Sequence, residues 1–241
     1  MLKQIFIKIL RFIYPPRCYL CDVVVSFEGV CRDCFNKLQA SYKYNCNMCG
    51  IELKIAGTCL NCLAKPKIFD TISYCFVYNS EIFKLINGFK NHDKSYLAKF
   101  ISNFLIKKII EKQLADKIDI VIPIPIHYRK LIKRKYNHTA ILSKIIAKHF
   151  DKPFTYNTLK KIKKTKDQMK LNGKKRLTNV KGAFNINKNH LKYLKSKNIL
   201  LVDDVLTTGA TINECSKVLK ESGCRQVHIL IFARVNGTLK V

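Results

Sequence analysis

Acidic residues are scarce in this sequence of 241 residues. It holds 16 Asp and Glu against 45 Lys and Arg, which gives a formal net charge of +29. A charge this high excludes polycationic partners and favours polyanions, such as nucleic acid, phosphate-rich metabolites or an anionic membrane surface. The charge does not indicate disorder, because 48% of the residues are apolar, which is enough for a packed core.

The sequence also lacks a long apolar run and a secretory signal. No stretch reaches the roughly 18 apolar residues that a membrane-spanning helix needs. Lys3, Lys8 and Arg11 interrupt the apolar residues near the start, and no small-x-small cleavage site follows them. We therefore expect a cytoplasmic protein with no transmembrane segment. In that reducing compartment, paired cysteines indicate metal or redox chemistry rather than disulfides.

Residues 1–15 are the first of three expected segments. Within residues 2–14, apolar residues interleave with Lys3, Lys8 and Arg11 at the spacing of an amphipathic helix that ends before Pro15. Two interpretations stay open. The helix either makes a peripheral contact with a membrane surface or a partner, or it packs on its own chain.

Eight of the eleven cysteines form an internal repeat within the second segment, residues 16–64. They occur as four Cys-x-x-Cys pairs: Cys18/Cys21, Cys31/Cys34, Cys46/Cys49 and Cys59/Cys62. A shift of 28 residues lays the first two pairs on the last two. Two residues between thiolates let both sulfurs of a pair bind one ion, and two pairs complete a tetrahedron.

This repeat predicts a double zinc ribbon that holds two structural zinc ions. Sequential pairing places the first four cysteines on one ion and the last four on the other, and a cross-braced pairing of alternate knuckles is the alternative. Four protein ligands leave no open position, so we expect structural rather than catalytic sites. The three remaining cysteines, Cys75, Cys215 and Cys224, are expected to be buried core thiols.

The third segment, residues 65–241, alternates apolar strand patterns with helical ones. Strands are expected over 71–78, 119–124, 198–202 and 227–233. Helices are expected over 81–90, 94–112, 138–150 and 210–220. Such alternation predicts an α/β fold, a parallel sheet with helices on both faces, whose ligands bind beyond the carboxyl ends of the strands.

The sharpest motif is ILLVDDVLTTGAT at residues 199–211. An apolar strand runs into Asp203 and Asp204, then a Thr-Thr-Gly turn, then a helix. The amides of the turn and the start of the helix can bind a phosphate dianion, and Gly209 lets the backbone approach it closely. The two acids stand beside that site, where they can accept hydrogen bonds from a sugar diol.

This motif resembles the PRPP-binding signature of type I phosphoribosyltransferases, and its combination with a cysteine module is similar to the ComF family of competence proteins. The family is also described as amidophosphoribosyltransferase-like. The resemblance covers essentially the whole chain, through residues 85–90, 125–131 and 168–184 as well as the motif.

The resemblance implies a role for each matching position. The 5-phosphate of PRPP would lie on Thr207, Thr208, Gly209, Ala210 and Thr211. Asp203 and Asp204 would hold the ribose hydroxyls directly or through Mg²⁺, with Asp204 the acid or base of a transfer reaction. Pyrophosphate would meet Arg129, Arg134 and Lys135, and the segment from Gln168 to Arg176 would close over the reacting centre as a hood.

The sequence departs from the family at residues 134–138. The family usually shows Arg-Gly-Phe-Asn-Gln where this chain has Arg134-Lys135-Tyr136-Asn137-His138. Replacement of the glycine by Lys135 removes easy access to positive φ, and His138 puts a titratable group in place of an amide.

Residues 160–181 carry ten Lys or Arg and one acid, Asp167. Three interpretations stay open: a solvated loop, a hood that neutralises the leaving pyrophosphate, and a surface that tracks a nucleic-acid backbone. Three functions accordingly stay open, and they do not exclude one another. The first is a phosphoribosyltransferase with an unknown nitrogen acceptor. The second is single-stranded DNA handling during DNA uptake and natural transformation, with PRPP or a nucleotide only a ligand. The third is docking of a competence helicase or a membrane complex.

Overall fold

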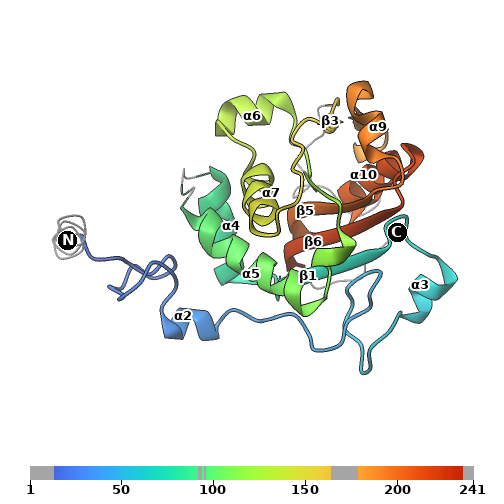
Figure 1. Ribbon diagram of the computed structural model, residues 1–241. Helices are drawn as coiled ribbons and strands as arrows, with labels where there is room; N and C mark the ends of the chain where they lie inside the picture. The colour runs from blue at the N-terminus through green and yellow to red at the C-terminus, as the bar shows by residue number, and fades with distance from the viewer. Residues whose placement is uncertain (1–13, 92–93, 95, 164–178, 236–241) are drawn as a thin grey trace.

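A four-stranded parallel sheet is the centre of the protein, in a computed structural model that describes residues 14–91, 94, 96–163 and 179–235 (Figure 1). Its strands follow the order β1-β6-β5-β2. They are β1 (Thr71–Val77), β6 (Gln226–Arg234), β5 (Asn198–Leu206) and β2 (Ile120–Pro123), and every pairing is parallel. The strands are almost wholly buried, as their near-continuous apolar runs predict for a sheet covered on both faces.

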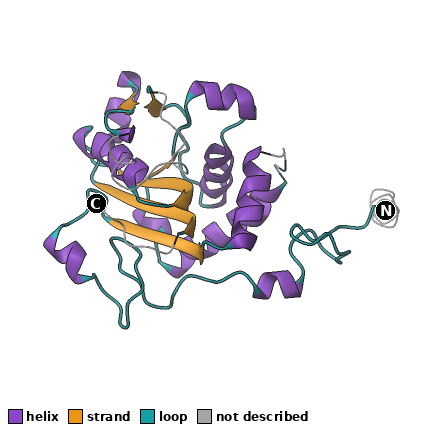
Figure 2. Cartoon of the chain, turned by 180° about the vertical axis from the view of Figure 1, so that it is seen from behind, coloured by secondary structure: helices purple, strands orange, loops and turns teal. Residues whose placement is uncertain are grey.

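Helices cover both faces of this sheet, as Figures 1 and 2 show. One face packs against α4 (Ser80–Asn91), α5 (Leu97–Glu111) and α7 (His138–His149). The other packs against α10 (Ala210–Glu221), α9 (Leu191–Leu194) and the hairpin of β3 (Leu159–Lys161) with β4 (Phe184–Ile186). The expected α/β fold is therefore confirmed.

Several elements differ from the sequence expectations. β5 continues to Leu206 instead of ending at Val202, because its last residues pair with β6 through Asp203↔Ile231 and Leu206↔Arg234. Helix α6 (Tyr128–Arg134) and the β3–β4 hairpin were not expected, and the 3₁₀ turns η1 (Ala115–Lys117) and η3 (Lys188–His190) join the larger elements. The helix expected over residues 2–14 lies outside the described residues, apart from Tyr14.

The cysteine-rich segment runs along the free edge of β1 (Figure 1). Residues 39–41 pair antiparallel with that edge, where Ser41 N–H donates to the Cys75 carbonyl at 2.8 Å and Val77 N–H donates to Gln39 at 2.8 Å. Two short helices begin directly after a cysteine of the repeat: α2 (Arg32–Asn36) after Cys31, and α3 (Leu60–Ala64) after Cys59. The edge of the sheet is thus covered by the chain itself.

The three cysteines outside the repeat are buried, as expected: Cys75, Cys215 and Cys224. No helix among the described residues has both the length and the apolar character that a bilayer crossing requires.

Candidate functional site

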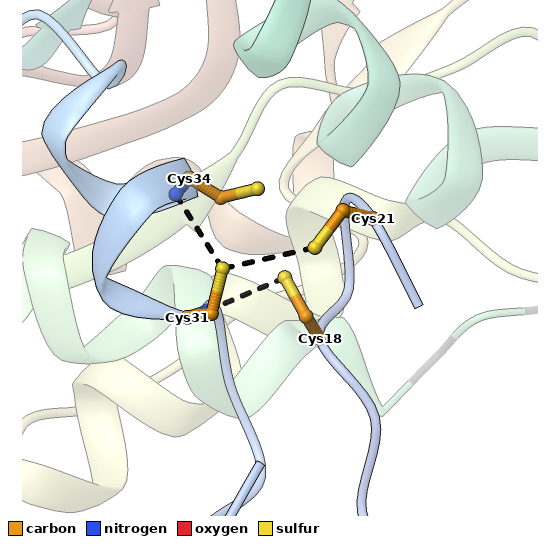
Figure 3. A group of neighbouring side chains, drawn as sticks. All are labelled: Cys18, Cys21, Cys31 and Cys34. Atoms are coloured by element: carbon orange, nitrogen blue, oxygen red, sulfur yellow. Dashed lines mark hydrogen bonds between the residues drawn. The ribbon is translucent and has the colours of Figure 1, made fainter. Parts of the chain in front are cut away.

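The eight repeat cysteines gather into two separate groups of four. The first group is drawn in Figure 3, and the second has the same arrangement: Cys18, Cys21, Cys31 and Cys34; Cys46, Cys49, Cys59 and Cys62. This is the sequential pairing, and the cross-braced alternative is wrong because each group is built from neighbouring knuckles. Every cysteine of the chain is free of disulfides.

The spacing of the sulfurs fits zinc. The Sγ atoms of Cys21 and Cys31 are 3.7 Å apart, and those of Cys49 and Cys59 are also 3.7 Å apart. Four Zn–S bonds of about 2.3 Å in a tetrahedron place neighbouring sulfurs about 3.8 Å apart. The donor set and its geometry therefore suit a structural zinc ion in each group.

Backbone amides prepare one sulfur of each group for metal binding. Cys31 N–H donates to Cys18 Sγ at 3.3 Å, and Cys59 N–H donates to Cys46 Sγ at 3.3 Å. Burial opposes ionisation of Cys18, but the backbone amides of Cys31, Leu20 and Cys21 outweigh burial and lower the pKa of Cys18 to about 6. The same balance lowers the pKa of Cys46 to about 7. Thiolates are the metal-binding form, so these amides favour ligation.

A second cluster lies where β5 ends. Asp204 is buried, and Asp203 beside it is half-buried. Lys90, in the last turn of α4, forms an ion pair with Oδ2 of Asp204. His138, the first residue of α7, places Nε2 at 3.6 Å from Oδ1 of the same carboxylate. Both oxygens of Asp204 are thus in contact with cationic or titratable groups from other elements.

These contacts separate the two acids electrostatically. Burial raises the pKa of Asp203, and the adjacent charge of Asp204 raises it further. Burial would also raise the pKa of Asp204, but Lys90 and His138 outweigh it and hold that pKa well below its usual range. Burial lowers the pKa of His138, with Asp204 opposing the shift. Asp204 is therefore the permanent anion, and Asp203 is the acid whose charge can change.

The turn after β5 has the shape of an anion cradle. Gly209 adopts φ 76°, a left-handed conformation that favours glycine, and it caps α10. A small hollow of about 40 Å³ is bounded by Asp203, Val205, Leu206, Thr207, Gly209, Ala210, Thr211 and Ile212. The Oγ1 of Thr208 is buried without a hydrogen-bond partner among the described residues. The amides at the start of α10 and the threonine hydroxyls together suit a phosphate group.

The loop after β2 reaches the same edge of the sheet. Asn137 caps α7 by accepting from Thr139 N–H at 3.2 Å, and Thr139 Oγ1 donates to the Ile124 carbonyl at 2.7 Å. These bonds fix the start of α7, and with it His138, against the end of β2. Tyr136 adds a hydrogen bond from its hydroxyl to the Phe89 carbonyl, which ties the loop to α4 next to Lys90.

Lys135 reaches the positive φ that the sequence suggested was lost. It adopts φ 64° at the end of α6, in the place where the family usually has glycine. The loop thus keeps a left-handed residue there, at a conformational cost of about 1 kcal/mol that glycine would avoid.

The structure brings together some predicted site residues and separates others. Asp203, Thr207, Gly209, Ala210 and Thr211 share the hollow, and the charge of Arg134 acts on His138. The exposed Arg129 instead donates to the Tyr128 hydroxyl at 3.1 Å, and Lys135 is exposed. Gln168 and Arg176 lie outside the described residues.

The sequence analysis did not identify Lys90 as a site residue, and it did not predict the contact of His138 with Asp204. Their contacts with Asp204 join residues 90, 138 and 204, which only the packing of α4 and α7 on β5 brings together. Two features of the sequence could have pointed to these residues: Phe89-Lys90 lies in a segment that resembles the family, and His138 stands where the family usually has an amide side chain.

Family models match both parts of the chain. The double zinc ribbon domain matches residues 9–63, and the phosphoribosyl transferase domain matches residues 138–241. These matches agree with the cysteine groups and with the α/β fold described above.

Curated relatives match along almost the whole length. Competence protein F of Haemophilus influenzae is 30% identical over 225 residues, which covers 90% of this chain and 96% of that protein. DNA utilization protein YhgH of Escherichia coli (strain K12) is 23% identical over 228 residues and covers 91% of this chain and 97% of its own. Among solved structures, purine phosphoribosyltransferase from Pyrococcus horikoshii aligns with a TM-score of 0.36 at 19% identity, over 56% of this chain and 74% of that one.

Proposed function

The chain belongs to the competence protein F family, and from this premise we propose that it binds PRPP with Mg²⁺ and acts in DNA uptake. The names of its relatives, competence protein F and DNA utilization protein YhgH, support the cellular role. We further propose that it works in the cytoplasm, because eleven cysteines without disulfides suit a reducing compartment. We keep the division into residues 1–15, 16–64 and 65–241 as part of this proposal.

One observation carries the ligand proposal: Asp203 and four residues of the turn border one hollow at the carboxyl end of β5, namely Thr207, Gly209, Ala210 and Thr211. In this proposal the 5-phosphate lies on the amides and hydroxyls of the turn, at the start of α10. A ribose hydroxyl donates to Asp203, which is half-buried and faces the hollow. Asp204 stays behind it, held by Lys90 and His138. In this proposal the ribose contact expected of both acids falls to Asp203 alone, and the proton uptake expected of Asp204 also moves to Asp203.

The donor chemistry at Asp203 also suits Mg²⁺, which prefers carboxylate oxygens together with substrate phosphates. When bound with PRPP, the ion would offset the charge of the pyrophosphate. The residues of this chain would orient the ribose and exclude water from it. In a transfer reaction, the bond from ribose C1 to pyrophosphate breaks and a bond to the acceptor nitrogen forms. Asp203 borders the hollow, where its carboxylate can take up the acceptor's proton.

Calorimetric titration of the full, zinc-loaded chain with PRPP and Mg²⁺ tests this proposal. We expect saturable binding that Asp203→Asn abolishes. Asp116→Asn, which removes an exposed acid of η1 and the same charge, should leave binding intact. Absence of binding to the unmodified chain would contradict the proposal. If the unmodified chain does bind PRPP, release of pyrophosphate in the presence of candidate nitrogen acceptors would distinguish transfer from binding alone.

A second candidate function, handling of single-stranded DNA with PRPP only a ligand, is favoured by the net charge of +29. Phosphate contacts release counterions, so affinity for single strands should fall with salt at a slope of about 0.7 per contact. Lys160→Glu/Lys163→Glu, in the basic stretch, should flatten this slope. Lys144→Glu/Lys148→Glu, an equal charge change on the exposed side of α7, should flatten it less. Affinity that does not depend on salt would contradict DNA binding through this stretch.

A further inference from the structure

A buried arginine joins the second zinc ribbon to the sheet. Arg234, the last residue of β6, is 3% exposed. Its Nε donates to the carbonyl of Cys49 at 3.3 Å, and its guanidinium lies 6.0 Å from the centre of the Tyr74 ring. Buried charged groups are costly unless hydrogen-bonded, and the Cys49 carbonyl of the ribbon is one of the groups that satisfy this arginine.

The second ribbon packs tightly around this contact. Gly50, with φ +71°, follows Cys49, and a Cβ there would lie 3.1 Å from the Tyr74 ring and 3.3 Å from Arg234 Cδ. Asn47, between the two ligands of the knuckle, accepts from Ile72 N–H of β1 at 2.8 Å. A hollow of about 540 Å³ beside the knuckle is bordered by Cys49, Cys59 and Arg234 among others.

The backbone of Arg234 leads directly to the phosphate turn. Arg234 stands opposite Leu206 in the β5–β6 register, and Val235 N–H donates to the Leu206 carbonyl at 2.9 Å. Leu206 immediately precedes Thr207, the first residue of the cradle. The path from the metal ligand Cys49 to the cradle therefore passes through one side chain and one strand pairing.

The first ribbon makes different contacts. Tyr19 lies 5.6 Å from the Phe100 ring edge-on, and Phe35 stacks on Phe104 at 6.1 Å between ring centres. Phe100 and Phe104 both belong to α5, on the sheet face opposite α10. Phe104 in turn lies 6.4 Å from the Phe232 ring of β6, so the first ribbon is linked to this strand through α5, whereas the second ribbon contacts its last residue directly.

We propose that Arg234 is a positioning residue that couples metal occupancy of the Cys46/Cys49/Cys59/Cys62 group to the phosphate turn at residues 207–211. Four bonds from the cysteines to Zn²⁺ would fix the backbone of the knuckle, and with it the Cys49 carbonyl. Loss of the metal loosens the knuckle that carries this carbonyl. Arg234 then loses the hydrogen bond that ties it to the ribbon, and the end of β6 holds Leu206 less firmly in place. The part of this proposal that concerns ligand affinity rests on the proposed function.

Matched ligand variants test the coupling in the full chain. Cys59→Ser and Cys31→Ser remove equivalent ligands from the second and first groups, since both cysteines donate their amide to the first sulfur of their own group. Hydrogen exchange followed by mass spectrometry reports on backbone protection without any ligand. We expect Cys59→Ser to raise exchange over residues 205–213, and Cys31→Ser to raise it over residues 97–104 of α5. An equal rise over residues 205–213 in both variants, or none in Cys59→Ser, would overturn the proposal.

A double-mutant cycle assigns the coupling to Arg234. In an Arg234→Met background, Cys59→Ser should add little further exchange over residues 205–213, and Arg234→Lys should restore part of the coupling. Additive effects would show that the ribbon acts on the turn by another route. If Arg234→Met does not fold, the comparison of the two cysteine variants still decides the proposal.

PRPP titration provides the functional arm. Cys59→Ser should weaken PRPP binding by about tenfold, within the usual range of coupling between sites, and Cys31→Ser should weaken it less. If the unmodified chain does not bind PRPP, the proposed function fails, and the exchange experiment still decides the coupling. If the unmodified chain binds PRPP and Cys59→Ser binds it equally well, the coupling fails while the proposed function stands.

Discussion

Lys90 and Asp204 form an ion pair across the sheet edge, from the last turn of α4 to the end of β5. The Asp204 side chain is 6% exposed and that of Lys90 is 22% exposed, so the pair is largely withdrawn from water. An unpaired charge on a buried carboxylate is destabilising, and His138 contacts the second oxygen of Asp204. The pair thus fixes α4, β5 and α7 relative to one another and leaves Asp203 as the acid that borders the hollow.

Removal of Lys90 should destabilise the protein. Lys90→Met leaves Asp204 buried with His138 alone, and we expect a loss of about 3 kcal/mol in the free energy of unfolding, measured by denaturant titration. Lys84→Met, on the exposed side of the same helix, should change stability by less than about 0.5 kcal/mol. The double variant Lys90→Met/Asp204→Asn should recover part of the loss. A Lys90→Met protein as stable as the parent would contradict the role of the pair.

His138 should make the protein less stable in mild acid. Its pKa is lowered in the folded state by burial, with Lys90 and Arg134 adding to the shift and Asp204 opposing it. The unfolded chain therefore binds more protons below about pH 6.5, so this contribution to stability is lost as the pH falls through that value. As the pH falls from 7 to 5, the unfolding free energy of the parent should therefore decrease more than that of His138→Gln. A difference that does not vary with pH would exclude this titration.

Asp203→Asn should stabilise the protein while it abolishes ligand binding. The raised folded-state pKa means that ionisation of Asp203 costs stability progressively as the pH rises above its unfolded value near 4. Asparagine removes that cost, and we expect a gain of about 1 kcal/mol near pH 8 that fades toward pH 4. Thermal unfolding at several pH values measures it. Asparagine can still accept from the Asp204 N–H, which donates to Oδ1 of Asp203 at 2.9 Å, so a variant less stable than the parent at pH 8 would contradict this prediction.

Alanine substitutions at two glycines should distinguish the effect of backbone strain from the effect on ligand binding. Gly209 (φ 76°) lies in the phosphate turn, and Gly223 (φ 83°) follows the other end of the same helix, α10. Alanine at either position must adopt a left-handed conformation, which costs about 1 kcal/mol. We expect Gly209→Ala to weaken PRPP binding and Gly223→Ala to leave it unchanged at a similar loss of stability. Equal binding by both variants would remove the turn from the ligand site.

The metal pairing can be read from zinc counts by native mass spectrometry. Two zinc ions per chain are expected, one for each group of four cysteines. Cys18→Ser/Cys31→Ser damages one group in the sequential pairing and should keep one ion, whereas Cys18→Ser/Cys46→Ser damages both groups and should keep none. The opposite result would indicate cross-braced sites.

Local chemistry made much of this protein predictable. The repeat of 28 residues specified eight metal ligands, because two residues between thiolates suffice to bind one ion. The apolar strand followed by Asp203, Asp204 and the Thr-Thr-Gly turn specified the cradle, because every part of it is contiguous in the chain. The alternation of strand and helix patterns likewise specified the α/β fold.

What depends on residues distant in sequence was decided by the tertiary structure. Lys90, His138 and Asp204 meet because α4 and α7 pack on the same face of β5. Lys135 adopts a positive φ where the two residues that follow it are held by distant parts of the chain, Tyr136 by the Phe89 carbonyl of α4 and Asn137 by the Ile124 carbonyl after β2. Arg234 and Cys49, which are 185 residues apart, share a hydrogen bond across the edge of the sheet. The sequence by itself determined which groups can bind metal and phosphate, since those groups are neighbours along the chain. The fold determined which acid borders the hollow and which ribbon contacts the last residue of β6, since burial and long-range contacts exist only in the packed structure.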